Sequence, residues 1–243
     1  MKDLSPKKNY DYIFIIVIFS VSVLLRLVCV WRGYDFERDA IYYIQTVEDW
    51  KSTGVFPANR ICYFPFLIPY GLSKCGINVS HAFLIQNILI GCLIPVEFYL
   101  VMKALHCRSE IVLAVGFFAA YHPTFIHYSC QPLRESLYLF LSLILICFLI
   151  HIWRFDSFCY HIIFGVFAAA IFFCRMEGLE WIMFYLFIIF IRQIHSCNSW
   201  KRFLQQGLAC GLSFAIIFSI AFFPIHNYVV RRCLDIVHTF LNN

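Results

Sequence analysis

Long apolar runs constrain this chain more than any other feature of its sequence. Windows of about 20 residues with few charges recur along the chain, and such a window is what an α-helix needs to cross the hydrocarbon core of a bilayer. Of its 243 residues, 62% are hydrophobic and only 14% are charged, which no ordinary soluble domain shows. The sequence therefore predicts an all-α polytopic membrane protein.

We expect roughly seven transmembrane helices in a single module over residues 1–243, with no separate soluble domain. The first run follows a basic start that suits a signal peptide, but no small-x-small cleavage site follows it, so a retained anchor is favoured. A shorter run, Tyr63–Leu72, contains Pro65 and Pro69 and predicts a re-entrant or interfacial segment. The expected spans lie near Tyr12–Trp31, His81–Leu105, Ile111–Ile126, Leu137–Trp153, Tyr160–Phe173, Leu179–Ile191 and Leu204–Pro224.

The distribution of Lys and Arg among the loops predicts the orientation. With the N-terminus inside, three cytoplasmic loops are basic and poor in acids: Lys103–Arg108, Arg154–Ser157 and Arg192–Arg202. The other face carries as many basic residues, but they stand in the long first loop or beside carboxylates. This orientation assigns four segments to the outer face: Arg32–Ser80, His122–Glu135, Arg175–Leu179 and the C-terminal tail.

The 12 cysteines do not have the spacing of a zinc site, because no CxxC pair is present. Five cysteines lie inside apolar runs and are expected to be small buried hydrophobes: Cys29, Cys92, Cys147, Cys174 and Cys210. Cys62, Cys75 and Cys130 fall in the expected outer loops, and the sequence leaves a disulfide among them open. A net charge of +5 without a basic stripe argues against a nucleic-acid partner.

An acidic and aromatic patch, Asp35–Tyr43, follows the first span, where ionisable groups cost little. From Asp39 onward, apolar residues recur at helical spacing and Gly54 is a suitable stop, which predicts an amphipathic helix in the membrane interface. Asp39 lies in the first turn, where the helix dipole favours its anion, so it is suited to accept a proton. The alternative is that Glu37, Arg38 and Asp39 cap this helix and pair with one another.

Two further clusters combine an arginine with an acid on the expected outer face. Arg134 and Glu135 enter a span at its first turn, where an arginine fork can grip a phosphate. The alternative there is a helix cap and a contact with any lipid headgroup. Arg175 and Glu177 interrupt an apolar stretch and need a partner. Three such clusters on one face indicate a site for an anionic, lipid-borne group.

The order of these motifs resembles the GT-C glycosyltransferases, and the closest branch is that of the protein O-mannosyltransferases and aminoarabinose transferases. The resemblance covers about the first 190 residues. It rests on Phe36–Ile44, a Trp- and Gly-terminated helix, Tyr63–Pro65, His122-Pro123, Leu133–Tyr138 and Arg175–Gly178, in that order.

The resemblance implies that Asp39 is the catalytic base, with Glu37 as its substitute. The base would deprotonate an acceptor hydroxyl or amine that attacks the anomeric carbon of a sugar carried on polyprenyl phosphate. Residues implied to bind the donor phosphate are Arg134, Glu135 and Arg175, and further candidates are Arg38, Tyr43, His122 and Glu177. Some family members bind a divalent cation near these acids and others need none, so a metal is left open.

Members of this family usually run to several hundred residues, so we also consider a non-catalytic or truncated GT-C-like module. Such a module would bind polyprenyl-phosphate lipid or act as a subunit of a second membrane polypeptide. A small transporter is weaker, because only Arg26 and Glu97 lie well inside the early spans. The resemblance implies the bacterial cytoplasmic membrane, with the active site on its outer face.

Overall fold

The computed structural model describes residues 8–33, 35–57, 62–155, 157–196 and 200–241, with the side chains of residues 8–10, 196 and 221–241 left aside. Tyr34 and residues 58–61 of the expected first loop therefore lie outside the described residues. All regular structure in the described part is helical. Its elements are α1 (Lys8–Trp31), α2 (Arg38–Thr53), α3 (Phe64–Lys74), α4 (Val79–Ala104), α5 (Ser109–Tyr121), α6 (Pro123–Ser129), α7 (Glu135–Phe155), α8 (Phe158–Cys174), η1 (Met176–Gly178), α9 (Leu179–Ser196) and α10 (Trp200–Leu241).

Five helical segments among the described residues are long and apolar enough to cross a membrane. They are Asp11–Trp31, Val79–Ala104, Glu135–Phe155, Met176–His195 and Trp200–Ile220. Helices α5 and α6 meet at His122 with a bend of 51°. If this bent pair crosses the membrane as one broken span, it is the sixth candidate. The all-α membrane character is thus confirmed. The count of seven stays a prediction, because α8 is apolar but has only 17 residues.

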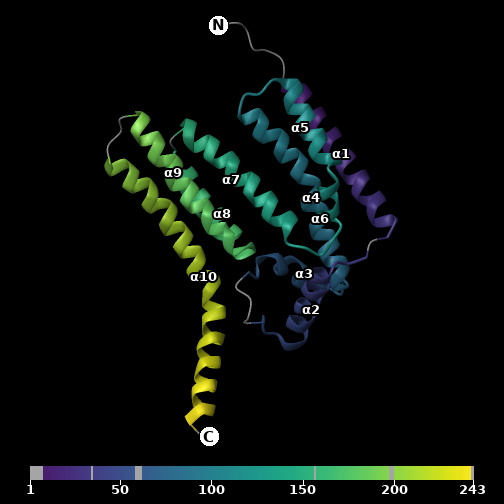
Figure 1. Ribbon diagram of the computed structural model, residues 1–243, viewed down its shortest axis with the longest axis vertical. Helices are drawn as coiled ribbons and strands as arrows, with labels where there is room; N and C mark the ends of the chain where they lie inside the picture. Colours follow the sequence, from purple (N-terminus) through teal and green to yellow (C-terminus); the bar gives the residue numbers. More distant parts are fainter. Residues whose placement is uncertain (1–7, 34, 58–61, 156, 197–199, 242–243) are drawn as a thin grey trace. The chain divides into compact units, whose positions relative to one another are not determined.

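The chain divides by its contacts into two compact units. Unit 1 comprises Met1–Glu48 and Pro65–Ile150, and unit 2 comprises Asp49–Phe64 and His151–Asn243. Figure 1 shows the helices of each unit, which are described separately below. The single module over residues 1–243 stays a prediction.

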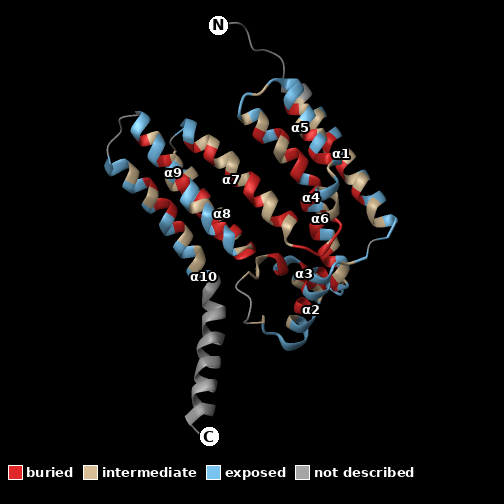
Figure 2. Ribbon diagram, viewed as in Figure 1, coloured by how far each residue is buried: buried red, intermediate tan, exposed pale blue. Residues whose placement is uncertain are grey.

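Helix α4 is the central helix of unit 1. It contacts α1, α5 and α6, and an apolar cluster around Ile18, Tyr99 and Val112 joins it to α1 and α5. A second cluster around Ile94 and Leu143 joins α4 to α7. Figure 2 shows buried residues along α4, whereas α1 has many exposed apolar side chains. An apolar surface of this kind suits contact with lipid chains, because a bilayer does not penalise its exposure.

The expected amphipathic helix is α2, and its apolar face is buried against protein. The ring of Tyr43 meets the ring of Phe66 in α3 edge-on at 5.4 Å, and Phe66 meets Phe83 in α4 at 6.1 Å. The helix ends as expected at Gly54, whose φ of +71° is the left-handed conformation that glycine adopts at no steric cost. Gly54 N donates to Trp50 O at 2.9 Å. The packing of Tyr43 gives it a structural role in this unit.

Helix α3 contains the proline-rich run that was expected to be re-entrant or interfacial. It has 11 residues with Pro69 inside it. At 1.5 Å per residue it is about 16 Å long, which is too short to cross a bilayer. Gln86 of α4 donates from Nε2 to the Pro65 carbonyl at 3.2 Å and so holds the start of α3. Its placement as a re-entrant or interfacial segment stays a prediction.

Unit 2 is built on contacts among α8, α9 and α10. Helices α8 and α10 approach most closely at Gly165, where any Cβ would overlap the carbonyl oxygen of Cys210 and the hydroxyl of Ser213. Aromatic rings extend this contact, because Phe173 stacks on Phe218 at 5.5 Å. A glycine at position 165 therefore sets the separation of these two helices.

We expect Gly165→Ala to destabilise unit 2 by about 1–3 kcal/mol, because the added methyl group overlaps backbone atoms that cannot move cheaply. The measurement is the thermal unfolding midpoint in detergent. Gly211→Ala in α10 is the matched control, since an added Cβ there meets nothing within 4 Å. Alanine is the better helix former, so this control should be neutral or slightly stabilising. Equal midpoints for the two variants would contradict the close approach at Gly165.

Candidate functional site

The loop that carries the expected base is fastened by Gln131, a residue that sequence reasoning missed. Gln131 is fully buried in the turn between α6 and α7. Its Nε2 donates to the carbonyl oxygen of Asp35 at 3.0 Å, and its Oε1 accepts from the backbone N–H of Glu37 at 3.3 Å. One amide side chain thus fixes the backbone on both sides of Phe36, directly before α2 begins.

The turn that holds Gln131 is itself held by Asn87 of α4. Asn87 is fully buried, and its Nδ2 donates to the carbonyl oxygens of Gln131 at 2.5 Å and Leu133 at 2.7 Å. Figure 2 shows this turn as buried. Buried carbonyl groups need such donors, since an unsatisfied one costs about 1–3 kcal/mol. Asn87 and Gln131 therefore connect α4, the α6–α7 turn and the first loop in one network.

Glu37 pairs with a histidine that the sequence analysis had not selected. Its Oε1 lies 2.6 Å from Nε2 of His127 in α6, and both side chains are partly exposed. In the described part of the chain, no hydrogen bond or ion pair joins the side chains of Glu37 and Arg38. The Glu37 side chain thus contacts a helix residue 90 positions away, while the backbone carbonyl oxygen of Glu37 accepts from Ile41 N at 3.1 Å at the start of α2. The alternative that Glu37, Arg38 and Asp39 cap this helix stays a prediction.

Asp39 lies in the first turn of α2, as the sequence predicts, and is exposed. Within the described residues, its carboxylate makes no hydrogen bond and no ion pair. Arg38 is also exposed on the same turn. Both side chains are therefore accessible to a molecule that approaches the start of α2.

Arg134 and Glu135 stand where the α6–α7 turn becomes α7. Glu135 is the first residue of the helix, and the Arg134 carbonyl accepts from the N–H of Tyr138 at 3.0 Å. Both side chains are partly buried. They follow directly after Leu133, which Asn87 holds, so the network that fixes the Glu37 loop also fixes the start of α7.

His122 lies at the bend between α5 and α6. Its ring is 4.7 Å from that of Phe125 and 5.2 Å from that of Phe118. His122 Nδ1 is buried and finds no hydrogen-bond partner among the described residues. The histidine thus packs among aromatic rings at the point where the bent pair changes direction.

Arg175 and Glu177, the expected third cluster, belong to unit 2 and pair with each other. Arg175 Nη2 lies 3.0 Å from Glu177 Oε1, and Nε lies 3.4 Å from Oε2. This two-point contact spans η1, which connects α8 to α9. The partner that the sequence required for these charges is therefore found within the same turn.

Arg26 supports α6 from inside unit 1. It is fully buried in α1, its Nε donates to Ser129 Oγ at 2.7 Å, and its Nη1 donates to the Ser22 carbonyl at 3.1 Å. The guanidinium lies across Gly91, where an added Cβ would be 2.8 Å from Nε. Because Ser129 closes α6 two residues after His127, Arg26 fixes the end of the helix that presents His127.

No group of three His, Cys, Asp or Glu side chains within the described ranges could hold a metal ion. The Glu37–His127 pair offers two potential ligands. Within the described residues, no disulfide joins the ten cysteines whose side chains are placed, among them Cys62, Cys75 and Cys130. Burial raises the pKa of the Cys130 thiol, which keeps it protonated next to the Arg26 carbonyl.

No protein-family model and no curated protein matches this chain.

Proposed function

We propose that this protein is a GT-C-type glycosyltransferase that moves a sugar from a polyprenyl-phosphate donor to an acceptor at the outer face of a membrane. The observation that carries the proposal is the network of Asn87 and Gln131. It fastens the loop with Glu37 and Asp39 to the turn that leads into Arg134 and Glu135. Carboxylate and guanidinium groups thus come from two segments of unit 1 that one set of hydrogen bonds holds.

In the proposed reaction, Asp39 takes the proton of an acceptor hydroxyl or amine. The acceptor then bonds to the anomeric carbon of the donor sugar, the bond between that carbon and the phosphate oxygen breaks, and polyprenyl phosphate leaves. Arg134 offsets the charge of that phosphate, since its fork matches phosphate oxygens in two-point geometry. The Asp39 carboxylate is exposed and has no hydrogen-bond partner among the described side chains, which supports the role given to it.

Glu37 and His127 have a positioning role in this proposal. Their contact at 2.6 Å joins the start of α2 to α6 and limits the movement of the loop that carries Asp39. Glu135 and Arg175 remain proposed as further ligands of the donor phosphate, and Glu177 remains a further candidate. The bacterial cytoplasmic membrane, with the reaction on its outer face, is part of the same proposal.

A second candidate function is a non-catalytic module that binds polyprenyl-phosphate lipid or serves as a subunit. One observation favours it: Arg175, an expected phosphate ligand, already contacts Glu177 at two points. A guanidinium paired in this way has less capacity to hold a donor phosphate during a reaction.

Mass spectrometry of surface glycans and glycoproteins, with and without the gene, tests the proposal. We expect one sugar modification to disappear on deletion and to return with the wild-type gene. Binding of polyprenyl phosphate by the purified protein, measured in parallel, separates the two candidates. Lipid binding without any dependent glycan supports the second candidate. If the protein shows neither lipid binding nor a dependent glycan, both candidate functions are excluded.

A further inference from the structure

A pocket of about 470 Å³ opens in unit 1 at the ends of two candidate spanning helices, α1 and α4, beside the start of α5. It lies between the first turns of α1, the last turn of α4 and the start of α5. Its lining combines polar and apolar side chains: Asp11, Phe14, Tyr99, Lys103, Cys107, Ser109, Val112 and Leu113. These residues are separate from those of the candidate glycosyltransfer site, and the sequence analysis assigned no function to them.

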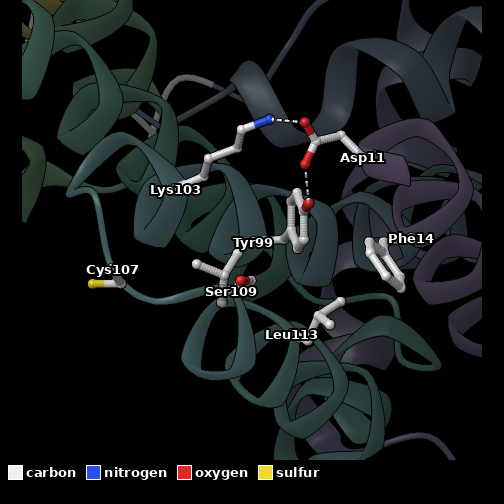
Figure 3. Close-up of a pocket in the computed structure, with 8 residues that line it drawn as sticks. Asp11, Phe14, Tyr99, Lys103, Cys107, Ser109 and Leu113 are labelled. Carbon is white, nitrogen blue, oxygen red and sulfur yellow. Dashed lines mark hydrogen bonds and ion pairs between the residues drawn. The ribbon is translucent and has the colours of Figure 1, made fainter. Parts of the chain in front are cut away.

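The polar part of the pocket is a triad centred on Asp11, which Figure 3 shows. Asp11 Oδ1 accepts from Tyr99 Oη at 2.7 Å, and Oδ2 accepts from Lys103 Nζ at 2.5 Å. Tyr99 is buried, whereas the side chains of Lys103 and Asp11 are 48% and 32% exposed. Both charges are therefore fixed by the fold and still accessible to a ligand.

The triad has further hydrogen-bonding capacity. A lysine ammonium has three N–H donors and a carboxylate has about four acceptor positions. The two hydrogen bonds of the triad use one donor of Lys103 and two acceptor positions of Asp11. A ligand can thus add a bond to each group without breaking the existing ion pair. It would need an acceptor for Lys103 and a donor for Asp11.

The two charges also select the charge type of the ligand. The ammonium and the carboxylate cancel, so an anionic ligand meets attraction from Lys103 and repulsion from Asp11 within a few ångströms. A zwitterion with one cationic and one anionic group matches both. The apolar wall of Phe14, Val112 and Leu113 continues into the cluster around Ile18, which suits a hydrocarbon chain attached to such a headgroup.

We propose that this pocket binds the headgroup of an ethanolamine phospholipid. The ammonium of the headgroup donates to Asp11, and a phosphate oxygen accepts from Lys103. The pocket lies at the ends of spanning helices, where headgroups surround a membrane protein, and its volume accommodates a group of that size. A choline headgroup has the same charges but no N–H, so it cannot donate to Asp11.

The first test uses the wild-type full-length protein and varies only the lipid. Native mass spectrometry in detergent would compare phosphatidylethanolamine, its N,N-dimethyl form, phosphatidylcholine and phosphatidylglycerol with identical acyl chains. We expect phosphatidylethanolamine to bind about fivefold more tightly than phosphatidylcholine, which corresponds to about 1 kcal/mol for a partly exposed charged contact. The dimethyl form, which keeps one N–H, should fall between them.

The second test uses variants with controls at the same end of the unit. Asp11→Asn should remove the preference for ethanolamine over choline, and Lys103→Gln should weaken the binding of both lipids. Glu110→Gln and Arg108→Gln are the matched controls, because these residues flank Ser109 and do not line the pocket. Both should keep the wild-type preference.

Three results would overturn the proposal. Equal binding of all four lipids would show that the pocket does not select a headgroup. Tightest binding of phosphatidylglycerol would identify an anionic-lipid site. A preference for ethanolamine that persists in Asp11→Asn would place the amine elsewhere. The lipid series on the wild-type protein decides the matter even if a variant fails to fold.

Discussion

Replacing Asp39 with Asn is expected to lower the rate of sugar transfer by about 10²- to 10⁴-fold, because a positioned general base contributes rate enhancements of that size. The substitution removes the proton acceptor and preserves the shape of the side chain. Asp39 is exposed and its carboxylate makes no hydrogen bond or ion pair with the other described residues, so the fold should be unaffected. Initial rates in proteoliposomes supplied with polyprenyl-phosphate sugar would measure the loss.

Two further variants make the result specific to Asp39. Asp49→Asn removes another exposed carboxylate from the same helix, and transfer should stay at the wild-type rate. Glu37→Gln keeps a hydrogen-bonding group opposite His127, so we expect a loss of no more than about tenfold. A severe loss in Glu37→Gln with full activity in Asp39→Asn would make Glu37 the base. Full activity in both variants would remove the first loop from the mechanism.

The helices could be predicted from the sequence because their signals are local. Apolar runs of sufficient length mark the candidate spans, and the bounds of α2 follow from Asp39 in its first turn and Gly54 after its end. The bend at His122-Pro123 is harder to predict from the sequence than these helix bounds. The apolar run continues through it, although proline at the first position of a helix commonly marks a new start.

The network that holds the candidate site could not be predicted, because it joins residues far apart in the sequence. Gln131 contacts Glu37 across 94 positions, and Asn87 contacts Gln131 across 44. Uncharged amides in apolar surroundings give no periodic signal, so nothing local marks them as important. Tyr43 was expected on a helix whose apolar face lies in the membrane interface, whereas its ring packs against Phe66 of α3 and is 7% exposed. That contact too joins segments that are apart in the sequence.

Replacing Asn87 with Asp is expected to destabilise unit 1 by about 3–5 kcal/mol, which is the largest stability effect that we predict. Asn87 acts as a donor to two buried carbonyl oxygens, at 2.5 and 2.7 Å. An aspartate has nearly the same shape, but it would place a carboxylate oxygen against both acceptors and bury a charge whose described hydrogen-bond donor is the neutral amide of Gln86 at 3.3 Å. The thermal unfolding midpoint in detergent would report the effect.

Asn78→Asp is the matched control on the same helix. Asn78 caps the start of α4 and uses its side chain as an acceptor, since Oδ1 accepts from Ser80 N at 2.9 Å. Aspartate accepts equally well there, and the helix dipole favours its charge, so stability should change by less than about 0.5 kcal/mol. The same substitution should thus be severe at position 87 and nearly silent at position 78. Equal midpoints would show that Asn87 does not hold the turn, and the network that supports the proposed site would lose its role.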